Sequence, residues 1–244
     1  MDIVIVSGGF DPIHSGHIAL LRAAAKFGRV VVLLNSDAWL ARKKGRAFMP
    51  WAERAAVLRD LKYVAAVRRV NDSDGTVCDG IAGVIAANGG KFYFANGGDR
   101  TADNTPEQAL CAALGVEVLF GIGGGKTASS SDFLGIVQRP WGRWQVLVEG
   151  PDYKVKTLTV LPGQRLSLQR HEQREEYWQV LEGVADVRLG SSWSRIFPME
   201  TLFIAKRQWH QLYNGGPKPL VILETQRGVC IEEDIERAVT RPQQ

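Results

Sequence analysis

The first half of the chain alternates short apolar runs with longer amphipathic stretches. The runs cover residues 3–9, 30–35, 64–70, 92–98 and 116–123, and the intervening segments are long enough for helices. Continuous apolar runs of this length are typical of strands buried on both faces, and strands that alternate with helices build parallel sheets. The pattern predicts a doubly wound, Rossmann-like α/β domain over residues 1–137.

The second half follows a different period. Polar and apolar residues alternate one by one, as in residues 153–160, and turn residues such as Pro162-Gly163, Gly183 and Gly190 separate the segments. A period of two is typical of strands with one buried face, and many short strands between turns indicate an antiparallel barrel or jelly roll. We expect an all-β barrel over residues 138–244, joined closely to the first domain.

Composition narrows the class of protein. The 244 residues fit two domains, and 45% hydrophobic with 23% charged residues is ordinary for a soluble globular protein. No apolar run approaches the roughly 20 residues of a membrane helix, so we expect no membrane association. The chain enters its first strand without a basic leader or a cleavage site, which predicts a cytoplasmic location.

Cysteine usage and charge exclude further classes. The three cysteines are scattered without CxxC spacing, so neither a disulfide framework nor a thiolate zinc site is indicated. The net charge of +4 is modest, and basic residues are dispersed except for a cluster within residues 42–46. This distribution favours a local phosphate site over a nucleic-acid surface, and we expect no nucleic-acid partner.

A glycine-rich turn and two histidines follow the first apolar run. Residues 7–17 read SGGFDPIHSGH, and a helical pattern begins at Ile18. A glycine turn that leads into a helix presents backbone N–H groups to a phosphate. His14 and His17 can face one side of the helix and donate hydrogen bonds to charge that grows on a triphosphate. Alternatively, the glycines only shape a tight turn and the histidines satisfy local hydrogen bonds.

The complete string resembles the HxGH signature of the nucleotidyltransferase superfamily, in the form of glycerol-3-phosphate cytidylyltransferase and the heptose-phosphate adenylyltransferases. The resemblance continues through residues 35–37, 43–46, 50, 53–54 and 97–99, and so spans nearly the whole first half. It implies that a substrate phosphate oxygen attacks the α-phosphate of a nucleoside triphosphate, with Mg²⁺, and that pyrophosphate leaves. CTP and ATP are the two expected donors, and a phosphorylated sugar or polyol is the expected acceptor.

The resemblance also implies residue roles. The expected catalytic residues are His14, His17, Lys44 and Lys126, and the expected nucleotide or substrate ligands are Gly8, Gly9, Phe10, Asp11, Lys43, Arg54, Asp99, Thr127, Ser129 and Ser130. Lys44 would contact phosphates, with Lys43 as an equally plausible register, and Arg54 would hold the substrate phosphate. Asp99 would contact the base, the ribose or a metal, or else cap a turn. Residues 123–131 resemble the family's second signature with Lys126 in place of arginine, although a serine-rich helix cap would look the same.

A second group of polar residues lies on the predicted strands of the second half. Alternation would aim Gln169 and His171 into one barrel interior, and Glu176 and His210 can complete a mixed nitrogen and oxygen site for a divalent metal. A single histidine on a strand is more often a surface residue or a hydrogen-bonded one. The metal interpretation therefore depends on the four residues together.

This joint pattern resembles the cupin superfamily. More narrowly, RPWG at 139–142, RLSLQ at 165–169, Arg174, Trp178 and GVADVRLG at 183–190 resemble the cupin domain of type II mannose-6-phosphate isomerase. The resemblance implies Zn²⁺ or another divalent metal on Gln169, His171, Glu176 and His210, and an aldose-ketose isomerisation. The chain lacks the Tyr-Gly-Arg tail of that family, which puts the isomerase chemistry in question.

The two resemblances together predict a bifunctional enzyme in the synthesis of a nucleotide-activated sugar or polyol. In the alternative, only the transferase is catalytic and the cupin serves as a ligand-binding or dimerisation module. Both families commonly form dimers, so a homodimer is expected.

Overall fold

The computed structural model describes residues 1–125 and 129–238. The chain divides into two compact units, Met1–Phe133 and Leu134–Gln244. The sequence pattern alone puts the boundary slightly later, after residue 137, whereas β6 (Ile136–Arg139) pairs with a strand of the second unit. The predicted site residues Lys126 and Thr127 lie outside the described residues.

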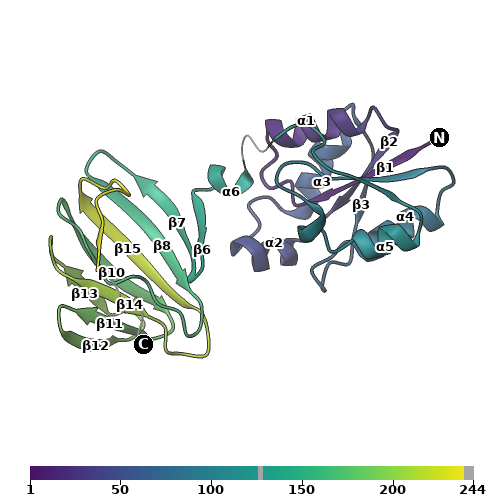
Figure 1. Ribbon diagram of the computed structural model, residues 1–244. Helices are drawn as coiled ribbons and strands as arrows, with labels where there is room; N and C mark the ends of the chain where they lie inside the picture. The colour runs from purple at the N-terminus through teal and green to yellow at the C-terminus, as the bar shows by residue number, and fades with distance from the viewer. Residues whose placement is uncertain (126–128, 239–244) are drawn as a thin grey trace. The chain divides into compact units, whose positions relative to one another are not determined.

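A parallel sheet of five strands forms the centre of the first unit (Figure 1). The strand order is β3-β2-β1-β4-β5, which confirms the predicted α/β class. The strands are β1 (Ile3–Gly8), β2 (Arg29–Leu34), β3 (Val64–Arg69), β4 (Phe92–Ala95) and β5 (Glu117–Leu119). Strand β5 is shorter than the apolar run predicts, because Gly121, Gly123 and Gly124 turn the chain with positive φ angles.

Helices cover both faces of this sheet. The helices are α1 (Ser15–Ala24), α2 (Asp37–Lys44), α3 (Trp51–Arg59), α4 (Cys78–Ala86), α5 (Gln108–Ala113) and α6 (Ser130–Phe133), with a 3₁₀ turn η1 (Ala102–Asn104). Alternate strand residues pack on opposite faces: Val4 and Val6 lie against α1 and α3, and Ile3 and Ile5 lie against α4 and α5. This two-sided burial explains why the strands read as continuous apolar runs.

Strands β1 and β4 lie side by side in the centre of the sheet. From β1 the chain adds β2 and β3 on one side, and it then returns to add β4 and β5 on the other side. In open α/β sheets, ligands bind beyond the carboxyl ends of the strands at such a reversal. The glycine turn after β1 and the Gly97–Asp99 stretch after β4 both start at this edge. The topology therefore brings together two segments that are about 90 residues apart in the sequence.

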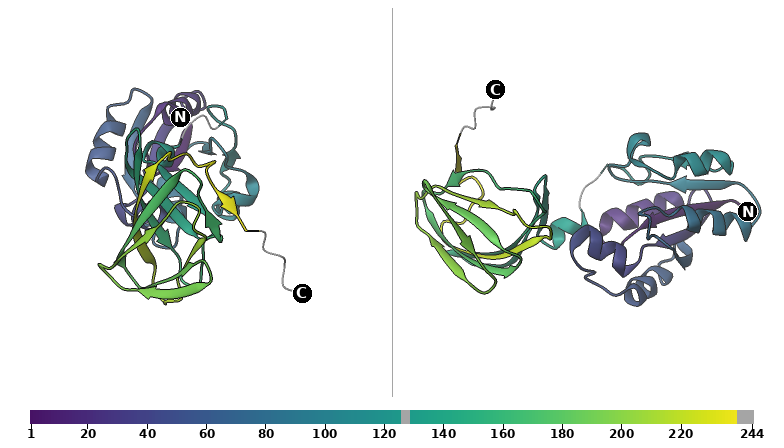
Figure 2. Two further views of the ribbon diagram at one scale, coloured as in Figure 1. Left: turned by 90° about the vertical axis from the view of Figure 1, so that its left-hand side faces the viewer. Right: turned by 90° about the horizontal axis from the view of Figure 1, so that it is seen from below.

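The second unit consists of two antiparallel sheets that curl into a barrel (Figure 2). Their strand orders are β13-β10-β15-β8-β7-β6 and β12-β11-β14-β9-β16. The strands are β6 (Ile136–Arg139), β7 (Gly142–Glu149), β8 (Tyr153–Val160), β9 (Gln169–Arg170), β10 (Arg174–Glu182), β11 (Ala185–Leu189), β12 (Ser192–Ile196), β13 (Thr201–Ile204), β14 (His210–Tyr213), β15 (Leu220–Gly228) and β16 (Glu236–Arg237). The predicted all-β cupin barrel is confirmed.

The barrel interior has an apolar end and a polar end. On β8, β10 and β15 every second residue is buried along most of the strand. The buried residues change from polar to apolar along β8 and β10, and from apolar to polar along β15, which is antiparallel to both. The apolar end is built by residues such as Leu158, Val160, Val180, Leu220 and Ile222. The polar end, as the term is used below, consists of Lys154, Lys156, Arg174, Glu176, Glu224 and Gln226. Buried charges contribute little net stability, so the polar end indicates a site and not a core.

Candidate functional site

The two histidines of the first unit form a stacked pair at the start of α1. The helix begins at Ser15, earlier than the sequence predicts, so His14 is its N-cap and His17 lies in its first turn. The ring centroids are 3.8 Å apart with an interplanar angle of 27°. The backbone N–H of His14 donates to His17 Nδ1 at 3.3 Å, which fixes the orientation of the second ring. His14 Nδ1 is buried without a hydrogen-bond partner among the described residues.

Both imidazoles are kept neutral by their surroundings. Burial, together with the nearby His14 and Lys44, lowers the pKa of His17 to about 3. Burial and Lys44 also lower the pKa of His14, although Asp132 opposes this shift. At neutral pH each ring therefore has one N–H donor and one acceptor nitrogen. A pair of neutral donors beside a cation can bind an anion, and an anion that arrives there would raise both pKa values.

The loop between β1 and α1 is held in a tight conformation. Phe10 is buried with φ of 49°, and its ring lies 4.7 Å from the His17 ring. A Cβ atom on Gly8 would come within 3.2 Å of the Phe10 ring, and one on Gly9 within 2.8 Å of the Leu40 side chain. The two glycines therefore let the loop lie against its own aromatic residue and against α2. Whether Gly8, Gly9 or Phe10 also contacts a ligand remains a prediction.

Asp11 fastens the same loop to the segment before α3. Its buried carboxylate accepts hydrogen bonds from the backbone N–H groups of Phe48 and Met49, each at 2.8 Å. The Asp11 carbonyl accepts from Lys44 Nζ at 2.9 Å. These contacts indicate that Asp11 positions the loop and Lys44, and a direct ligand contact of Asp11 stays a prediction.

Arg54 occupies the centre of this side of the domain. Its guanidinium is fully buried and donates to the carbonyl groups of Gly9 (2.7 Å), Asn35 (3.0 Å) and Met49 (3.0 Å), and to the Asp37 carboxylate (2.5 Å). The residue thereby links the glycine turn, the end of β2 and the start of α2. The family resemblance assigns Arg54 to the substrate phosphate. Its contacts indicate a positioning role, and a direct contact with the substrate phosphate stays a prediction.

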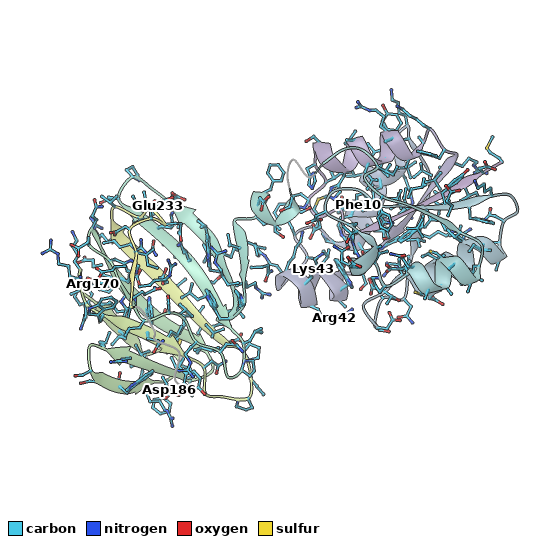
Figure 3. All side chains as sticks on the ribbon, in the orientation of Figure 1. Phe10, Arg42, Lys43, Arg170, Asp186 and Glu233 are labelled. Carbon is cyan, nitrogen blue, oxygen red and sulfur yellow. The ribbon has the colours of Figure 1, made fainter. Side chains whose placement is uncertain are left out.

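The two neighbouring lysines of α2 have different environments. Lys44 is buried with its ammonium group beside the glycine loop, and burial lowers its pKa to about 8 although Asp11 opposes the shift. Lys43 is exposed, and its ammonium lies 4.6 Å from the Trp39 ring centroid (Figure 3). Of the two registers that the sequence leaves open, Lys44 is therefore the one beside the histidine pair.

The remaining predicted ligands lie at the same edge. Asp99 is in an exposed turn after β4, where its carbonyl accepts from Asn104 Nδ2 at 3.0 Å. Ser129 and Asp132 cap α6 reciprocally, with the Ser129 N–H bound to the Asp132 carboxylate at 3.1 Å. Ser130 Oγ donates to the Pro12 carbonyl at 2.9 Å, which attaches α6 to the loop before the histidines. The ligand roles of Asp99, Ser129 and Ser130 stay predictions.

The second candidate site lies at the polar end of the barrel. His171 Nε2 is 3.2 Å from Glu176 Oε1, and His210 Nε2 is 3.6 Å from Glu176 Oε2. Gln169 Nε2 lies 3.5 Å from His210 Nε2. Strand pairing between β9 and β14 places Gln169 directly opposite His210. The structure thus brings together the four predicted metal ligands from separate segments.

These residues fit a divalent metal. Metal–ligand distances of about 2.0–2.1 Å in a tetrahedral site correspond to ligand–ligand separations of about 3.3–3.5 Å, close to those observed here. The ligand atoms of His171, Glu176 and His210 all lie within 4.8 Å of one another, and the three residues are buried. Gln169 would bind through its amide oxygen, which now accepts from Ser167 Oγ at 2.9 Å, so the amide would have to turn over.

A network that the sequence analysis missed joins Glu176 to a second buried carboxyl group, Glu224. Trp178 Nε1 donates to Glu176 at 3.2 Å and to Glu224 at 3.1 Å. Gln226 Nε2 donates to Glu224 at 2.7 Å and to Glu176 at 3.4 Å. Alternation on β15 could have identified Glu224 and Gln226 as inward-facing polar residues, but only the folded barrel pairs them with β10.

The two carboxyl groups have opposite pKa shifts. Burial alone would raise the pKa of Glu176, but a hydrogen bond from His171 and the charges of His210, His171 and Arg174 outweigh it and lower the pKa. Burial and the charge of Glu176 raise the pKa of Glu224, and the positive charges of Lys156 and Arg174 oppose this rise only in part. Such separation is typical of a pair in which one carboxylate binds a cation and the other exchanges protons.

Comparison with protein families assigns both domains. Residues 5–124 match the cytidylyltransferase-like family, and residues 128–239 match the mannose-6-phosphate isomerase C-terminal family. The chain joins these two domains. The cytidylyltransferase-like domain carries the histidine pair, and the isomerase-type cupin domain carries the cluster of His171, Glu176 and His210.

Curated relatives align over about one domain. The mannose-1-phosphate guanylyltransferase RfbM of Salmonella typhimurium is 39% identical over 98 residues, which are 40% of this chain and 20% of that protein. The alginate biosynthesis protein AlgA of Pseudomonas aeruginosa is 40% identical over 102 residues, 41% of this chain and 21% of that protein. The chain thus spans about a fifth of the length of these relatives. The aligned stretch is too short to include both domains.

Two solved structures align with part of this chain, each at a TM-score below 0.5. A conserved protein with a double-stranded β-helix domain from Klebsiella pneumoniae aligns with 47% of this chain and 99% of its own length, at 19% identity and a TM-score of 0.39. A cupin 2 domain-containing protein from Halorhodospira halophila covers 38% of this chain and 73% of its own length, at 26% identity and a TM-score of 0.33. In the described part of this chain, no helix combines the length and apolar character needed to span a bilayer.

Proposed function

We propose that the cytidylyltransferase-like domain transfers CMP or AMP from a nucleoside triphosphate to a phosphorylated sugar or polyol and releases pyrophosphate. The observation that carries this proposal is the stacked pair of neutral histidines beside Lys44, with the buried Nδ1 of His14 unpartnered among the described residues. The match of residues 5–124 to the cytidylyltransferase-like family supports it. A triphosphate beyond β1 and β4 would meet this pair at the start of α1.

In the proposed reaction the protein supplies positions and donors. A phosphate oxygen of the acceptor attacks the α-phosphorus, and the bond to the β-phosphate oxygen breaks as pyrophosphate leaves. His14 and His17 donate hydrogen bonds to the oxygens on which charge grows, and Lys44 contributes a positive charge. Asp11 and Arg54 hold the loop in which these groups lie. Mg²⁺, when bound with the triphosphate, would neutralise part of the phosphate charge.

The decisive experiment measures pyrophosphate release from the full chain with Mg²⁺. Each of the four nucleoside triphosphates is combined with glycerol 3-phosphate, heptose 1-phosphate, mannose 1-phosphate or mannose 6-phosphate. We expect release that requires one triphosphate, CTP or ATP, and one acceptor. Release that depends on GTP would show that the donor is the one named for the guanylyltransferase relatives, in place of CTP or ATP. The absence of pyrophosphate release with every pair would contradict the proposal.

The pKa of Lys44 predicts an alkaline limit to the reaction. Lys44 is charged below about pH 8 and neutral above it, so kcat/KM should fall by up to about tenfold per pH unit above pH 8. Titration of Lys44 does not destabilise the fold in this range. Its pKa in the folded protein lies below the unfolded value of about 10.4, so its contribution to the free energy of unfolding rises with pH between the two values. The measurement is the pH profile of pyrophosphate release.

Two neighbouring variants assign this limit. Lys44→Met should lower kcat/KM and remove the alkaline fall, whereas Lys43→Met, at the exposed neighbour, should retain it. The reverse result would show that Lys43 is the phosphate-binding lysine.

A second function is favoured by the polar end of the cupin domain. We propose that Gln169, His171, Glu176 and His210 bind Zn²⁺ or another divalent metal, and that the domain binds a phosphorylated sugar and interconverts its aldose and ketose forms. The bound metal would polarise the sugar oxygens. If no isomerisation of mannose 6-phosphate occurs with the metal present, the domain acts as a ligand-binding or dimerisation module. A homodimer and a cytoplasmic location remain part of the proposal.

Metal binding is tested by a matched pair of variants on β10. Glu176→Gln should weaken Zn²⁺ binding about 100-fold or more, because it removes a charged ligand from a buried site. Glu175→Gln changes the neighbouring residue, which faces away from the interior, and should leave the affinity unchanged. Isothermal titration calorimetry and the absorption spectrum of the Co²⁺-loaded chain measure the effect. Equal affinity in the two variants would contradict the proposed site.

A further inference from the structure

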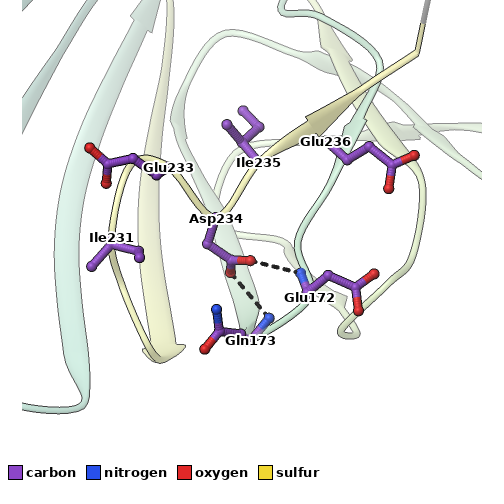
Figure 4. Close-up of a pocket in the computed structure, with 7 residues that line it drawn as sticks. All are labelled: Glu172, Gln173, Ile231, Glu233, Asp234, Ile235 and Glu236. Atoms are coloured by element: carbon purple, nitrogen blue, oxygen red, sulfur yellow. Dashed lines mark hydrogen bonds between the residues drawn. The ribbon is translucent and has the colours of Figure 1, made fainter.

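A strap of residues 230–236 follows β15 and leads into β16 beside the metal-ligand cluster. Figure 4 shows that it borders a pocket with Glu172 and Gln173. The Asp234 carboxylate accepts from the backbone N–H groups of Glu172 (3.0 Å) and Gln173 (3.1 Å), and its carbonyl contacts His171 Nδ1 at 2.5 Å. The strap is therefore attached to the loop that carries one of the candidate metal ligands.

Three buried cations of the polar end hold three consecutive residues of the strap. The bonds join Lys154 Nζ to the Cys230 carbonyl (2.8 Å), Arg174 Nη1 to the Ile231 carbonyl (2.8 Å) and Lys156 Nζ to the Glu232 carboxylate (2.5 Å). The side chains of Lys154, Lys156 and Arg174 are only 10%, 4% and 4% exposed. Two of these buried cations, Lys154 and Arg174, therefore donate hydrogen bonds to neutral carbonyl groups of the strap.

Carboxylates outside the strap neutralise the charge of Lys154, Lys156 and Arg174 only in part. Glu149 lies 3.4 Å from Lys154 Nζ but is 58% exposed, and Glu176, 3.1 Å from Arg174 Nε, belongs to the metal-ligand cluster. Glu224, opposite Lys156 on the next strand, directs its described hydrogen bonds to Trp178 and Gln226. Buried cations bound to neutral carbonyls can gain charge-assisted hydrogen bonds when an anion replaces the carbonyls.

A second observation also points to a ligand. Gln226 Oε1, at the same end of the barrel, is buried without a hydrogen-bond partner among the described residues. The residue lies directly opposite Lys154 in the pairing of β15 with β8, and opposite Glu176 in the pairing with β10. An unpaired buried amide oxygen costs free energy that a hydroxyl donor from a ligand would recover.

We propose that Lys154, Lys156 and Arg174 form a subsite for the phosphate group of a phosphorylated sugar, and that Glu232 occupies the place of this phosphate in the ligand-free protein. The inference rests on the proposed function, in which a sugar phosphate is the ligand of the cupin domain. Three phosphate oxygens can accept from all three cations at once, whereas among the described residues the Glu232 carboxylate forms a hydrogen bond with Lys156 alone. Gln226 Oε1 accepts from a sugar hydroxyl, and residues 230–232 move away as the phosphate enters.

Hydrogen–deuterium exchange of the strap in the full chain tests this subsite. Exchange in the peptide of residues 229–238 is compared without ligand and with inorganic phosphate, mannose 6-phosphate or mannose. This readout is local to the strap, so phosphate bound by the other domain does not contribute to it directly. We expect both phosphate compounds to raise the exchange rate about tenfold or more, because the strap loses its bonds to three cations, and mannose to have no effect.

Matched variants assign the effect to the cations and to Glu232. Glu232→Gln should lower the half-saturating phosphate concentration roughly threefold or more, since it removes the competing carboxylate. Glu233→Gln, an equivalent change at the next strap residue, should leave the concentration unchanged. Lys156→Met should raise it about tenfold or more. If Lys156→Met does not fold, as judged by circular dichroism, the comparison of Glu232→Gln with Glu233→Gln still tests whether Glu232 competes with phosphate for the subsite.

Two results would overturn the subsite: strap exchange in the unmodified chain that does not respond to phosphate, or equal phosphate affinity in Glu232→Gln and Glu233→Gln. Failure of the proposed isomerase chemistry looks different. In that case both phosphate compounds still release the strap, but mannose 6-phosphate is not converted to its ketose isomer.

Discussion

Replacing His14 with alanine should lower the turnover number of nucleotidyl transfer about 10²-fold or more while the nucleoside triphosphate still binds. The imidazole stacks on His17 and has a buried Nδ1 without a partner among the described residues. Its removal would delete the donor that we propose for the reacting phosphates. Pyrophosphate release gives the turnover number, and isothermal titration calorimetry gives the affinity for the triphosphate.

Two further variants separate catalysis from folding. His14 is also the N-cap of α1, and asparagine is a favoured N-cap residue. His14→Asn should therefore keep the helix stable but lower the turnover number as much as His14→Ala does. Arg22→Ala, on an exposed position of the same helix, should retain full turnover. Unchanged turnover in His14→Ala would exclude His14 from the chemistry.

Replacing Arg54 with methionine should lower the free energy of unfolding of the first domain by about 3 kcal/mol or more. Arg54 is fully buried, and the variant would leave the carbonyl groups of Gly9, Asn35 and Met49 without their donor. Urea unfolding followed by the helical circular dichroism signal measures this domain, because the described helices all lie in residues 15–133. Arg59→Met, at an exposed position of the same helix, should change the free energy by less than about 0.5 kcal/mol.

The same pair of variants distinguishes the two interpretations of Arg54. If Arg54→Met is as stable as Arg59→Met and only raises the KM for the acceptor, Arg54 binds the substrate phosphate, as the sequence predicts. A large loss of stability instead supports the positioning role that its contacts indicate.

Local pattern was sufficient for the architecture of both domains. The apolar runs near Val4, Val31 and Phe94 predicted buried parallel strands, because strands covered on both faces have no polar face to expose. The two-residue alternation of 153–160 predicted a strand with one inward face, and β8 has that burial pattern. The stretches 92–98 and 116–123 were exceptions, since β4 ends at Ala95 and β5 at Leu119, each before the glycines that close the apolar run.

The candidate sites depended more on tertiary structure. The spacing predicted that His14 and His17 lie close together. The folded protein shows in addition that α1 begins at Ser15 and that the two rings stack. Burial in the fold lowers the pKa of both rings. Lys43 and Lys44 are equivalent in the sequence pattern, because adjacent residues on a helix differ only in the direction they face, and that direction relative to the glycine turn is set by the fold.

The presence of two domains, their fold classes and the residue types that can act on phosphates and metals follow from the amino-acid sequence, because they depend on local periodicity and on motifs with short spacing. Three contacts became visible in the folded protein alone: the carbonyl groups around Arg54, the position of Glu224 beside Glu176, and the bond from Lys156 to Glu232. These contacts join residues far apart in the chain, and strand pairing and loop closure set them through long-range geometry that no local pattern encodes.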